Sequence, residues 1–214
     1  MDNIRYTLIT DGSSDAVLIP ILNWLLVEHG NYISIQSQWA DFAKLPRPPK
    51  TLIEKIDYAL DKYPCDLLFI HRDAERESRE DRQREIDTAY ANMHKNEATP
   101  LPYICVIPVR MTEAWLLFDE GAVRRAAGNE STKIFLDVPP LYRLESLPDP
   151  KTTLHDLLRK ASGLQGRRLK KFSTHQRVRH ISELIDDFSP LRALSAFGAM
   201  EYDVQRLIEL HSMA

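Results

Sequence analysis

Four short apolar runs along the chain are separated by stretches in which hydrophobic side chains recur every three or four residues. The runs are typical of β-strands, and the stretches between them of amphipathic helices. Strands are predicted over residues 5–10, 32–39, 65–70 and 103–109, and helices over residues 15–29, 51–63, 77–95 and 112–128. This alternation predicts an α/β fold with an open, mostly parallel, Rossmann-like sheet that carries helices on both faces.

Two of these segments indicate their place in the sheet. The run CDLLFI, residues 65–70, is apolar at nearly every position, which favours a strand covered on both sides. The segment 51–63 places four apolar residues on one helical face: Leu52, Ile56, Ala59 and Leu60. Ser13 or Ser14 can cap the first predicted helix, and Gly30 can close it.

The pattern changes after two consecutive prolines at residues 139–140, since the later segments have helical spacing without a clear strand. We therefore predict an α/β domain over residues 1–138 and a helical, basic C-terminal extension over residues 139–214. The charge divides in a similar way, because residues 151–214 hold 11 Lys and Arg against 7 Asp and Glu, whereas residues 1–150 hold 17 against 24. An acidic body with a basic tail suits a protein that binds both cations and a polyanion, with chance as the alternative.

The composition is that of an ordinary globular protein, with 43% hydrophobic and 28% charged residues among 214, a length that suits one domain with a small helical annex. The longest apolar run, residues 16–27, contains Pro20 and Asn23 and is too short to span a bilayer. The first twelve residues lack a signal-peptide pattern. Cys65 and Cys105 lie in apolar runs without zinc-ligand spacing, which favours free thiols in a cytoplasmic protein without membrane contact.

Acidic residues follow three of the four predicted strands. Asp11 and Asp15 follow the first strand, Asp73 and Glu75 the third, and Glu113 the fourth. Because ligands bind outside the carboxyl ends of the strands in such a sheet, we expect these carboxylates to meet at one edge. Crowded carboxylates repel each other unless a cation compensates them, and Mg²⁺ or Mn²⁺ prefers such oxygen ligands. The sequence therefore predicts a divalent-metal site of the kind that cleaves phosphodiester bonds.

Each acid also has a purely structural interpretation. Asp11 before Gly12 is a common turn sequence, and Asp15 can act as a helix cap. The acids after the later strands can favour helix N-termini through the helix dipole. For any single residue the structural interpretation is the stronger one, and only the coincidence of all five acids at one edge favours the metal site.

Two of these motifs resemble the TOPRIM domain, the divalent-metal domain of topoisomerases, primases and the OLD family of nucleases. An acid-Gly-x-x-acid sequence follows the first predicted strand, DGSSD at residues 11–15, and an Asp-x-acid pair follows the third, DAE at residues 73–75. Three further stretches are similar to small stand-alone bacterial TOPRIM-like proteins: VIPVRMTEAWLLFD (106–119), DPKTTLHDLL (149–158) and FSPLRAL (188–194). The resemblance covers most of the chain through short motifs.

The resemblance implies a Mg²⁺- or Mn²⁺-dependent nuclease in bacterial defence against phage or mobile DNA. It places Asp11, Asp73, Glu75 and Glu113 around the metals, with Asp15 as a further ligand, and gives catalytic roles to the first three. The chain departs from the family at two positions. The family usually has Glu where Asp11 stands and commonly has Asp where Glu75 stands.

Two more side chains belong to this expectation. Lys151, in the sequence DPK, is the candidate catalytic positive charge near the scissile phosphate, and a solvated lysine before a helix is an equal alternative. His71 adjoins the acidic pair, where it could orient water or simply end its strand.

The segment 166–180 is the candidate nucleic-acid interface. Its sequence GRRLKKFSTHQRVRH holds six basic residues: Arg167, Arg168, Lys170, Lys171, Arg177 and Arg179. Lys and Arg at this density neutralise phosphates with little dependence on base sequence. The single aromatic residue, Phe172, predicts backbone contact rather than base readout. The alternative is a solvated helix face that balances the acidic body.

Three functions stay open on this basis. The first is a metal-dependent nuclease that acts on DNA or RNA, and the second is a non-catalytic TOPRIM-like binding or assembly module. The third, a receiver-like phosphotransfer domain, is disfavoured because no conspicuous Lys follows the fourth predicted strand. The chain contains no G-x-x-x-x-G-K-[ST] sequence, so any ABC- or SMC-like ATPase partner is expected to be a separate polypeptide. Nothing in the sequence distinguishes DNA from RNA or endonuclease from exonuclease, or sets the oligomeric state.

Overall fold

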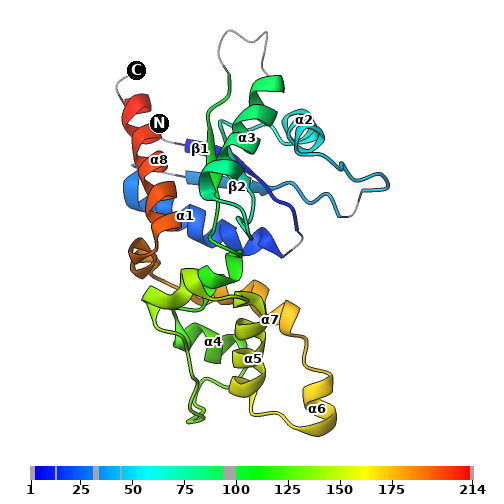
Figure 1. The fold of residues 1–214 in the computed structure, drawn as a ribbon, viewed down its shortest axis with the longest axis vertical. Coiled ribbons are helices and arrows are strands. Elements are labelled where there is room, and N and C mark those ends of the chain that lie inside the picture. Colours follow the sequence, from blue (N-terminus) through cyan, green and yellow to red (C-terminus); the bar gives the residue numbers. More distant parts are fainter. Residues whose placement is uncertain (1–2, 13, 31–33, 44, 94–99, 213–214) are drawn as a thin grey trace.

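Four parallel strands form the sheet at the centre of the protein (Figure 1). The computed structural model describes residues 3–12, 14–30, 34–43, 45–93 and 100–212. The strands lie in the order β2-β1-β3-β4 and have these bounds: β1 (Asn3–Ile9), β2 (Ser34–Trp39), β3 (Leu67–His71) and β4 (Tyr103–Val106). All three pairings are parallel, which confirms the predicted α/β class with an open, parallel sheet.

Helices cover both faces of this sheet (Figure 1). Their bounds are α1 (Leu18–His29), α2 (Leu52–Lys62), α3 (Arg79–Met93) and α8 (Ser195–Ser212). Successive residues of a strand point to opposite faces. Tyr6 and Leu8 accordingly lie in one buried cluster with residues of α1 and α8, whereas Ile9 lies in a second cluster with residues of α2 and α3. The sheet therefore separates two hydrophobic layers.

The predictions for the central strand and for α2 are confirmed. All five residues of β3 are buried, as expected for a strand covered on both sides. In α2, the predicted apolar face packs on the sheet. This helix begins in a capping box, because the Thr51 side chain accepts a hydrogen bond from the Glu54 N–H at 3.2 Å and Glu54 accepts one from the Thr51 N–H at 3.2 Å.

The predicted continuous helix over residues 112–128 is wrong. The segment forms a 3₁₀ helix, η2 (Thr112–Leu116), followed by α4 (Glu120–Ala126). The Asp119 side chain separates them because it accepts the Ala122 N–H at 2.8 Å and so starts a new helix. In a similar way, the first predicted helix begins as a 3₁₀ turn, η1 (Asp15–Val17), and Ser14 precedes it without a side-chain cap.

Three predicted positions lie outside the described residues. They are the candidate cap Ser13, the start of the second strand at Tyr32 and the end of the third helix at Lys95. Gly30 follows α1 as predicted, and its N–H bonds the Leu26 carbonyl at 2.9 Å.

The chain beyond residue 139 is helical, and no strand occurs in its described part. It contains η3 (Leu141–Ser146), α5 (Pro150–Ser162), α6 (Gly166–Lys170), α7 (Thr174–Ile181), η4 (Ser182–Leu184) and η5 (Ser189–Ala193) before α8. Helices α4 to α7 lie together beyond one end of the strands (Figure 1). Helix α8 then returns to the sheet, where Phe197 and Met200 share one buried cluster with Tyr6. A single core thus includes residues from both sides of position 138, and the division into two domains stays a prediction.

None of the described helices is both long enough and apolar enough to cross a membrane. Cys65 and Cys105 are free thiols. Burial raises the pKa of Cys105 to about 12, which keeps this thiol protonated and unreactive at neutral pH.

Candidate functional site

The switch point of the sheet, where the strand order changes direction, lies between β1 and β3. From β1 the chain passes through α1 to β2 on one side, whereas β3 and β4 lie on the other side. A crevice at the carboxyl ends of the strands is expected at such a point. An ion pair of 2.7 Å between Asp11 Oδ2 and Arg72 Nε joins the residues that follow these two strands. The predicted acids of the first and third strands therefore do reach one edge.

Asp11 is neutralised by two basic side chains. Its Oδ1 accepts a hydrogen bond from Lys55 Nζ at 2.6 Å, and its Oδ2 lies 2.7 Å from Arg72 Nε. Both cations are largely buried, and Arg72 also contacts Glu85 at 2.9 Å. Both oxygens of Asp11 are thus engaged by cations, so its carboxylate is poorly placed to bind a metal ion.

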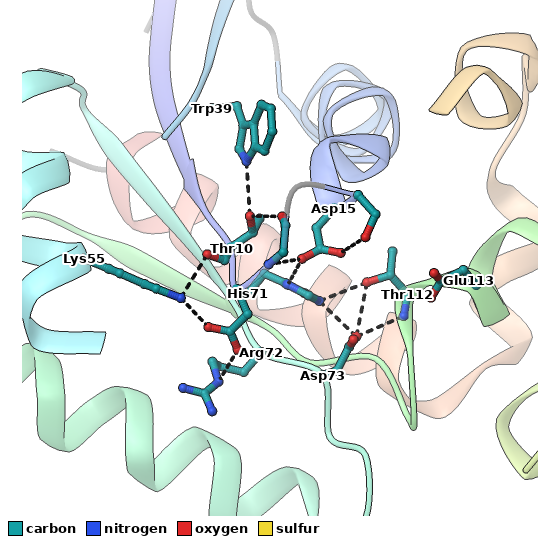
Figure 2. A network of polar contacts seen from close by, with 12 residues as sticks. Thr10, Asp15, Trp39, Lys55, His71, Arg72, Asp73, Thr112 and Glu113 are labelled. Atoms are coloured by element: carbon teal, nitrogen blue, oxygen red, sulfur yellow. Dashed lines mark hydrogen bonds and ion pairs between the residues drawn. The ribbon is translucent and has the colours of Figure 1, made fainter. Parts of the chain in front are cut away.

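Asp15 closes the turn after β1 (Figure 2). Its Oδ2 accepts the Gly12 N–H at 2.9 Å, and its Oδ1 accepts the Ser14 hydroxyl at 3.2 Å. Thr10 supports the turn from the strand side, because its hydroxyl donates to the Gly12 carbonyl at 2.9 Å and accepts the Trp39 indole N–H at 3.1 Å. A Cβ at Gly12 would lie 3.2 Å from Asp15 Oδ2, so this close approach favours glycine.

His71 lies between the two aspartates that follow β1 and β3 (Figure 2). Its side chain is 1% exposed, with Nε2 at 3.2 Å from Asp73 Oδ1 and Nδ1 at 3.5 Å from Asp15 Oδ2. Burial alone opposes charge on the ring, but the summed effect of Asp73, Asp15 and Asp11 raises the pKa of His71 above its ordinary value. The histidine therefore connects the two carboxylates from the buried side of the site.

Asp73 joins the end of β3 to the start of η2. Its Oδ1 accepts the Thr112 N–H at 2.9 Å and the Thr112 hydroxyl at 3.2 Å, and that hydroxyl also lies 2.9 Å from His71 Nε2 (Figure 2). The next residue after Thr112 is Glu113. The network therefore places the acid of the fourth strand beside the acid of the third.

Glu113 is a buried carboxylate with one cationic neighbour among the described residues. Its Oε1 lies 3.5 Å from Lys151 Nζ at the start of α5. Burial raises the pKa of Glu113, and the charges of Asp73 and Asp15 raise it further, whereas Lys151 opposes the shift. Burial likewise raises the pKa of Asp15, with repulsion from Asp73 added and His71 in opposition. Asp73 thus acts on both Asp15 and Glu113, and we call these three residues the acid cluster.

Glu75 does not join the acid cluster. Its side chain is 63% exposed, and its nearest cation is Arg82 on α3 at 3.8 Å. Its backbone has a φ of 54°, a left-handed conformation that its N–H stabilises by bonding the Arg110 carbonyl at 3.1 Å. The turn directs this carboxylate toward α3, so the structure separates the two acids of the DAE motif.

The predicted basic residues divide into two groups. All six are exposed, and none of them has an acidic partner within the part of the chain that the structure describes. Arg177 and Arg179 on α7 line a groove of about 620 Å³ whose opposite wall begins at Ala16, directly after Asp15. The other four lie on or next to α6, outside this groove. Cations of α7 therefore line the wall opposite the residues that follow Asp15.

Phe172 is not free to stack on a nucleic-acid base. It is half-buried against the core, and the Arg177 guanidinium lies 5.5 Å from its ring centroid. The mode of nucleic-acid contact stays a prediction.

The donor types of the acid cluster fit a hard divalent cation, because Asp15, Asp73 and Glu113 all offer carboxylate oxygens. As the side chains lie, no three His, Cys, Asp or Glu residues among those the structure describes are close enough to enclose a metal ion. Asp11 and Glu75 fit less well, since the first is paired with two cations and the second faces α3.

Three residues of this network were not predicted from the sequence. Arg72 and Thr112 directly precede the predicted acids Asp73 and Glu113, so adjacency was an available indication. Lys55 gave none, because it belongs to α2 and lies 44 positions from Asp11.

Comparison of the chain with models of protein families, with curated proteins and with solved structures gives no match. The resemblance to the TOPRIM domain therefore rests on the motifs alone and stays a prediction.

Proposed function

We propose that this protein is a nuclease that depends on Mg²⁺ or Mn²⁺ and hydrolyses phosphodiester bonds of DNA or RNA at the acid cluster. The observation that carries the proposal is the convergence of Asp15, Asp73 and Glu113, from three separate segments, at the switch point of a parallel sheet. Two of these acids, Asp15 and Glu113, are buried and have raised pKa values, and perturbed acids of this kind concentrate at functional sites.

Asp15, Asp73 and Glu113 would hold the cation. A bound divalent cation supplies Lewis acidity and an activated water at neutral pH. His71 keeps Asp15 and Asp73 at a fixed separation from the buried side of the site. Lys151, which is 39% exposed beside Glu113, is placed to bind a phosphate oxygen and so to orient the substrate.

A polyanionic substrate explains why cations line the approach to an acidic site. The acid cluster alone repels phosphates, so substrate binding needs positive charge nearby. Arg177 and Arg179 supply it on the wall of the groove opposite Ala16, and such contacts favour nucleic acid without regard to base sequence. By its resemblance, the nuclease would serve in bacterial defence against phage or mobile DNA, with any ABC- or SMC-like ATPase on a separate polypeptide.

Cleavage by the purified protein tests this proposal. Plasmid DNA and a structured RNA are incubated with Mg²⁺ or Mn²⁺, and Asp73→Asn is compared with the matched control Glu75→Gln, which alters an acid outside the acid cluster. We expect the wild type and the control to cut and Asp73→Asn to lose at least about a hundredfold in rate, as for loss of a metal ligand. Cleavage that persists in Asp73→Asn would refute the assignment.

A second candidate, a non-catalytic binding module, is favoured by one specific observation. Both oxygens of Asp11, the first acid of the TOPRIM-like motif, are paired with cations. A protein that binds nucleic acid but cuts neither substrate with either metal would support this module instead of the nuclease.

A further inference from the structure

Two histidines lie near the acid cluster without any role in it. His155 is on α5, one turn after Lys151, so both side chains share one face of that helix. His175 is in the first turn of α7, and its ring packs edge-on against that of His155 with a centroid distance of 5.0 Å and an interplanar angle of 83°. Lys151 in turn contacts Glu113 at 3.5 Å. Lys151, His155 and His175 therefore form a row that starts beside the acid cluster and extends from α5 to α7.

Positive charge is in excess around His155. Burial lowers the pKa of this half-buried ring, and His175, Arg159 and Lys151 lower it further. Two acids lie near enough to oppose them: Asp156, which already pairs with Arg159 at 2.9 Å, and Asp149, which accepts the Thr152 N–H at 2.8 Å. A site where neighbouring cations repel an imidazolium is one where a bound anion is stabilised.

We propose that Lys151, His155 and His175 form a phosphate subsite next to the acid cluster. The ammonium group and the ring N–H groups are hydrogen-bond donors suited to phosphate oxygens. The inference rests on the proposed function, since the bound group would be a phosphate of the nucleic acid adjacent to the one that is cleaved.

The position of the subsite agrees with the course of the groove. Arg179 lies one turn after His175 on α7 and lines the groove. A nucleic-acid backbone that leaves the groove along α7 would thus pass from Arg179 to His175 of the subsite. Each contact is with phosphate, which agrees with the covered ring of Phe172.

Histidine NMR tests the subsite without any need for cleavage. Imidazole signals of the full chain are recorded in EDTA, first with inorganic phosphate and then with a short single-stranded oligonucleotide. We expect both ligands to shift the signals of His155 and His175 and to raise the pKa of His155, because a nearby anion favours the charged ring. His29, which is bonded to Glu201 at 2.6 Å on α8, serves as the unaffected control. Absence of any shift refutes the subsite, and a shift with phosphate alone refutes its use for nucleic acid.

Binding measurements separate this inference from the nuclease proposal. Lys151→Gln and His155→Asn are compared with Lys160→Gln, a matched loss of charge near the other end of α5. In EDTA we expect Lys151→Gln to weaken oligonucleotide binding about fivefold. The slope of log binding constant against log salt concentration should become shallower by about 0.7, the value for one phosphate contact to a single strand. His155→Asn should weaken binding in the same direction, and Lys160→Gln should change it less than twofold. Unchanged affinity in Lys151→Gln and His155→Asn refutes the subsite even if the protein cuts. Loss of affinity in a protein that never cuts supports the subsite and refutes the nuclease.

Discussion

Asp73 Oδ1 accepts the backbone N–H of Thr112 at 2.9 Å. This bond holds Thr112, the first residue of η2, against the end of β3. It therefore fixes the position of the next residue, Glu113, relative to Asp73. The Thr112 hydroxyl adds contacts to His71 Nε2 at 2.9 Å and to Asp73 at 3.2 Å. One short segment thus links the acids of two strands.

Thr112→Val tests the hydroxyl in this link. The substitution keeps the shape and the backbone N–H but removes the hydroxyl partner of buried His71. Because His71 Nε2 keeps its contact with Asp73 at 3.2 Å, we expect the free energy of unfolding to fall by about 1 kcal/mol, the net contribution of one hydrogen bond. Urea denaturation measures it, with Thr88→Val on the exposed face of α3 as the control, where a change within about 0.5 kcal/mol is expected. Equal losses in the two variants would contradict a special role for Thr112.

Glu113→Gln is expected to separate stability from function. Burial opposes ionisation of the Glu113 carboxyl, as its raised pKa indicates, and the amide removes that cost while it keeps the size of the side chain. We therefore expect a higher urea midpoint at pH 7.5 together with loss of metal-dependent cleavage. A variant that is both less stable and fully active would contradict this assignment of Glu113.

The free energy of unfolding should rise as the pH is lowered from 8 toward 5.5, because three groups of the folded protein take up protons. His71, Asp15 and Glu113 all have raised pKa values in the folded state, so the folded protein binds their protons more tightly than the unfolded chain does. Their contribution is therefore largest at low pH and is lost as the pH rises through the folded values. Urea denaturation at several pH values checks this. The slope of unfolding free energy against pH should be smaller in His71→Gln than in the wild type. An unchanged slope in that variant would exclude His71 as a contributor.

Substitution of Asp11 should lower stability more than cleavage, whereas substitution of Asp73 should abolish cleavage. Asp11→Asn removes the charge that compensates Lys55 and Arg72, both largely buried, so we expect a stability loss of about 1 kcal/mol. Cleavage should fall less than about tenfold, because the carboxylate is occupied by these cations. A loss of activity as large as that of Asp73→Asn, without loss of stability, would instead assign Asp11 to the metal.

The strand-helix order was predictable because it depends on local spacing of apolar residues. The convergence of the acids was also predictable in outline, since parallel strands bring their carboxyl ends to one edge. Asp15, Asp73 and Glu113 follow that rule. The rule requires only the order of strands and helices, and this order can be predicted from the sequence.

The separation of Asp11 and Glu75 from the acid cluster was not predictable. Asp11 is paired with Lys55, and nothing local in the sequence indicates a contact across 44 positions. Glu75 faces away because its backbone has a φ of 54°, a conformation favoured by glycine and held here by the Arg110 carbonyl. The break between η2 and α4 has a local cause, the Asp119 cap, but the apolar pattern continues through it.

The attachment of α8 to the sheet should depend on Glu201. This residue is 7% exposed and bonds His29 of α1 at 2.6 Å and Arg192 at 2.8 Å. Glu201→Ala removes the hydrogen-bond partner of His29 and one of the two acids that pair with Arg192, the other being Glu28 at 3.2 Å, so we expect a loss of about 1–3 kcal/mol in unfolding free energy. Glu209→Ala, on the exposed side of the same helix, is the control and should change it by less than about 0.5 kcal/mol. Similar effects of the two substitutions would show that the contacts of Glu201 contribute little.

The two groups of basic residues should contribute unequally to nucleic-acid binding. Arg177 and Arg179 line the groove opposite Ala16, whereas Arg167 and Arg168 lie on α6 outside it. The double change of Arg177 and Arg179 to Gln should therefore weaken binding to a single-stranded oligonucleotide by at least tenfold and reduce the salt slope by about 1.4, the value for two phosphate contacts. The same double change at Arg167 and Arg168 removes equal charge and should alter the slope by less than half as much. Fluorescence anisotropy in EDTA at several salt concentrations measures both. If the α6 variant loses as much affinity as the α7 variant, the nucleic acid binds across α6, and the groove is not its path.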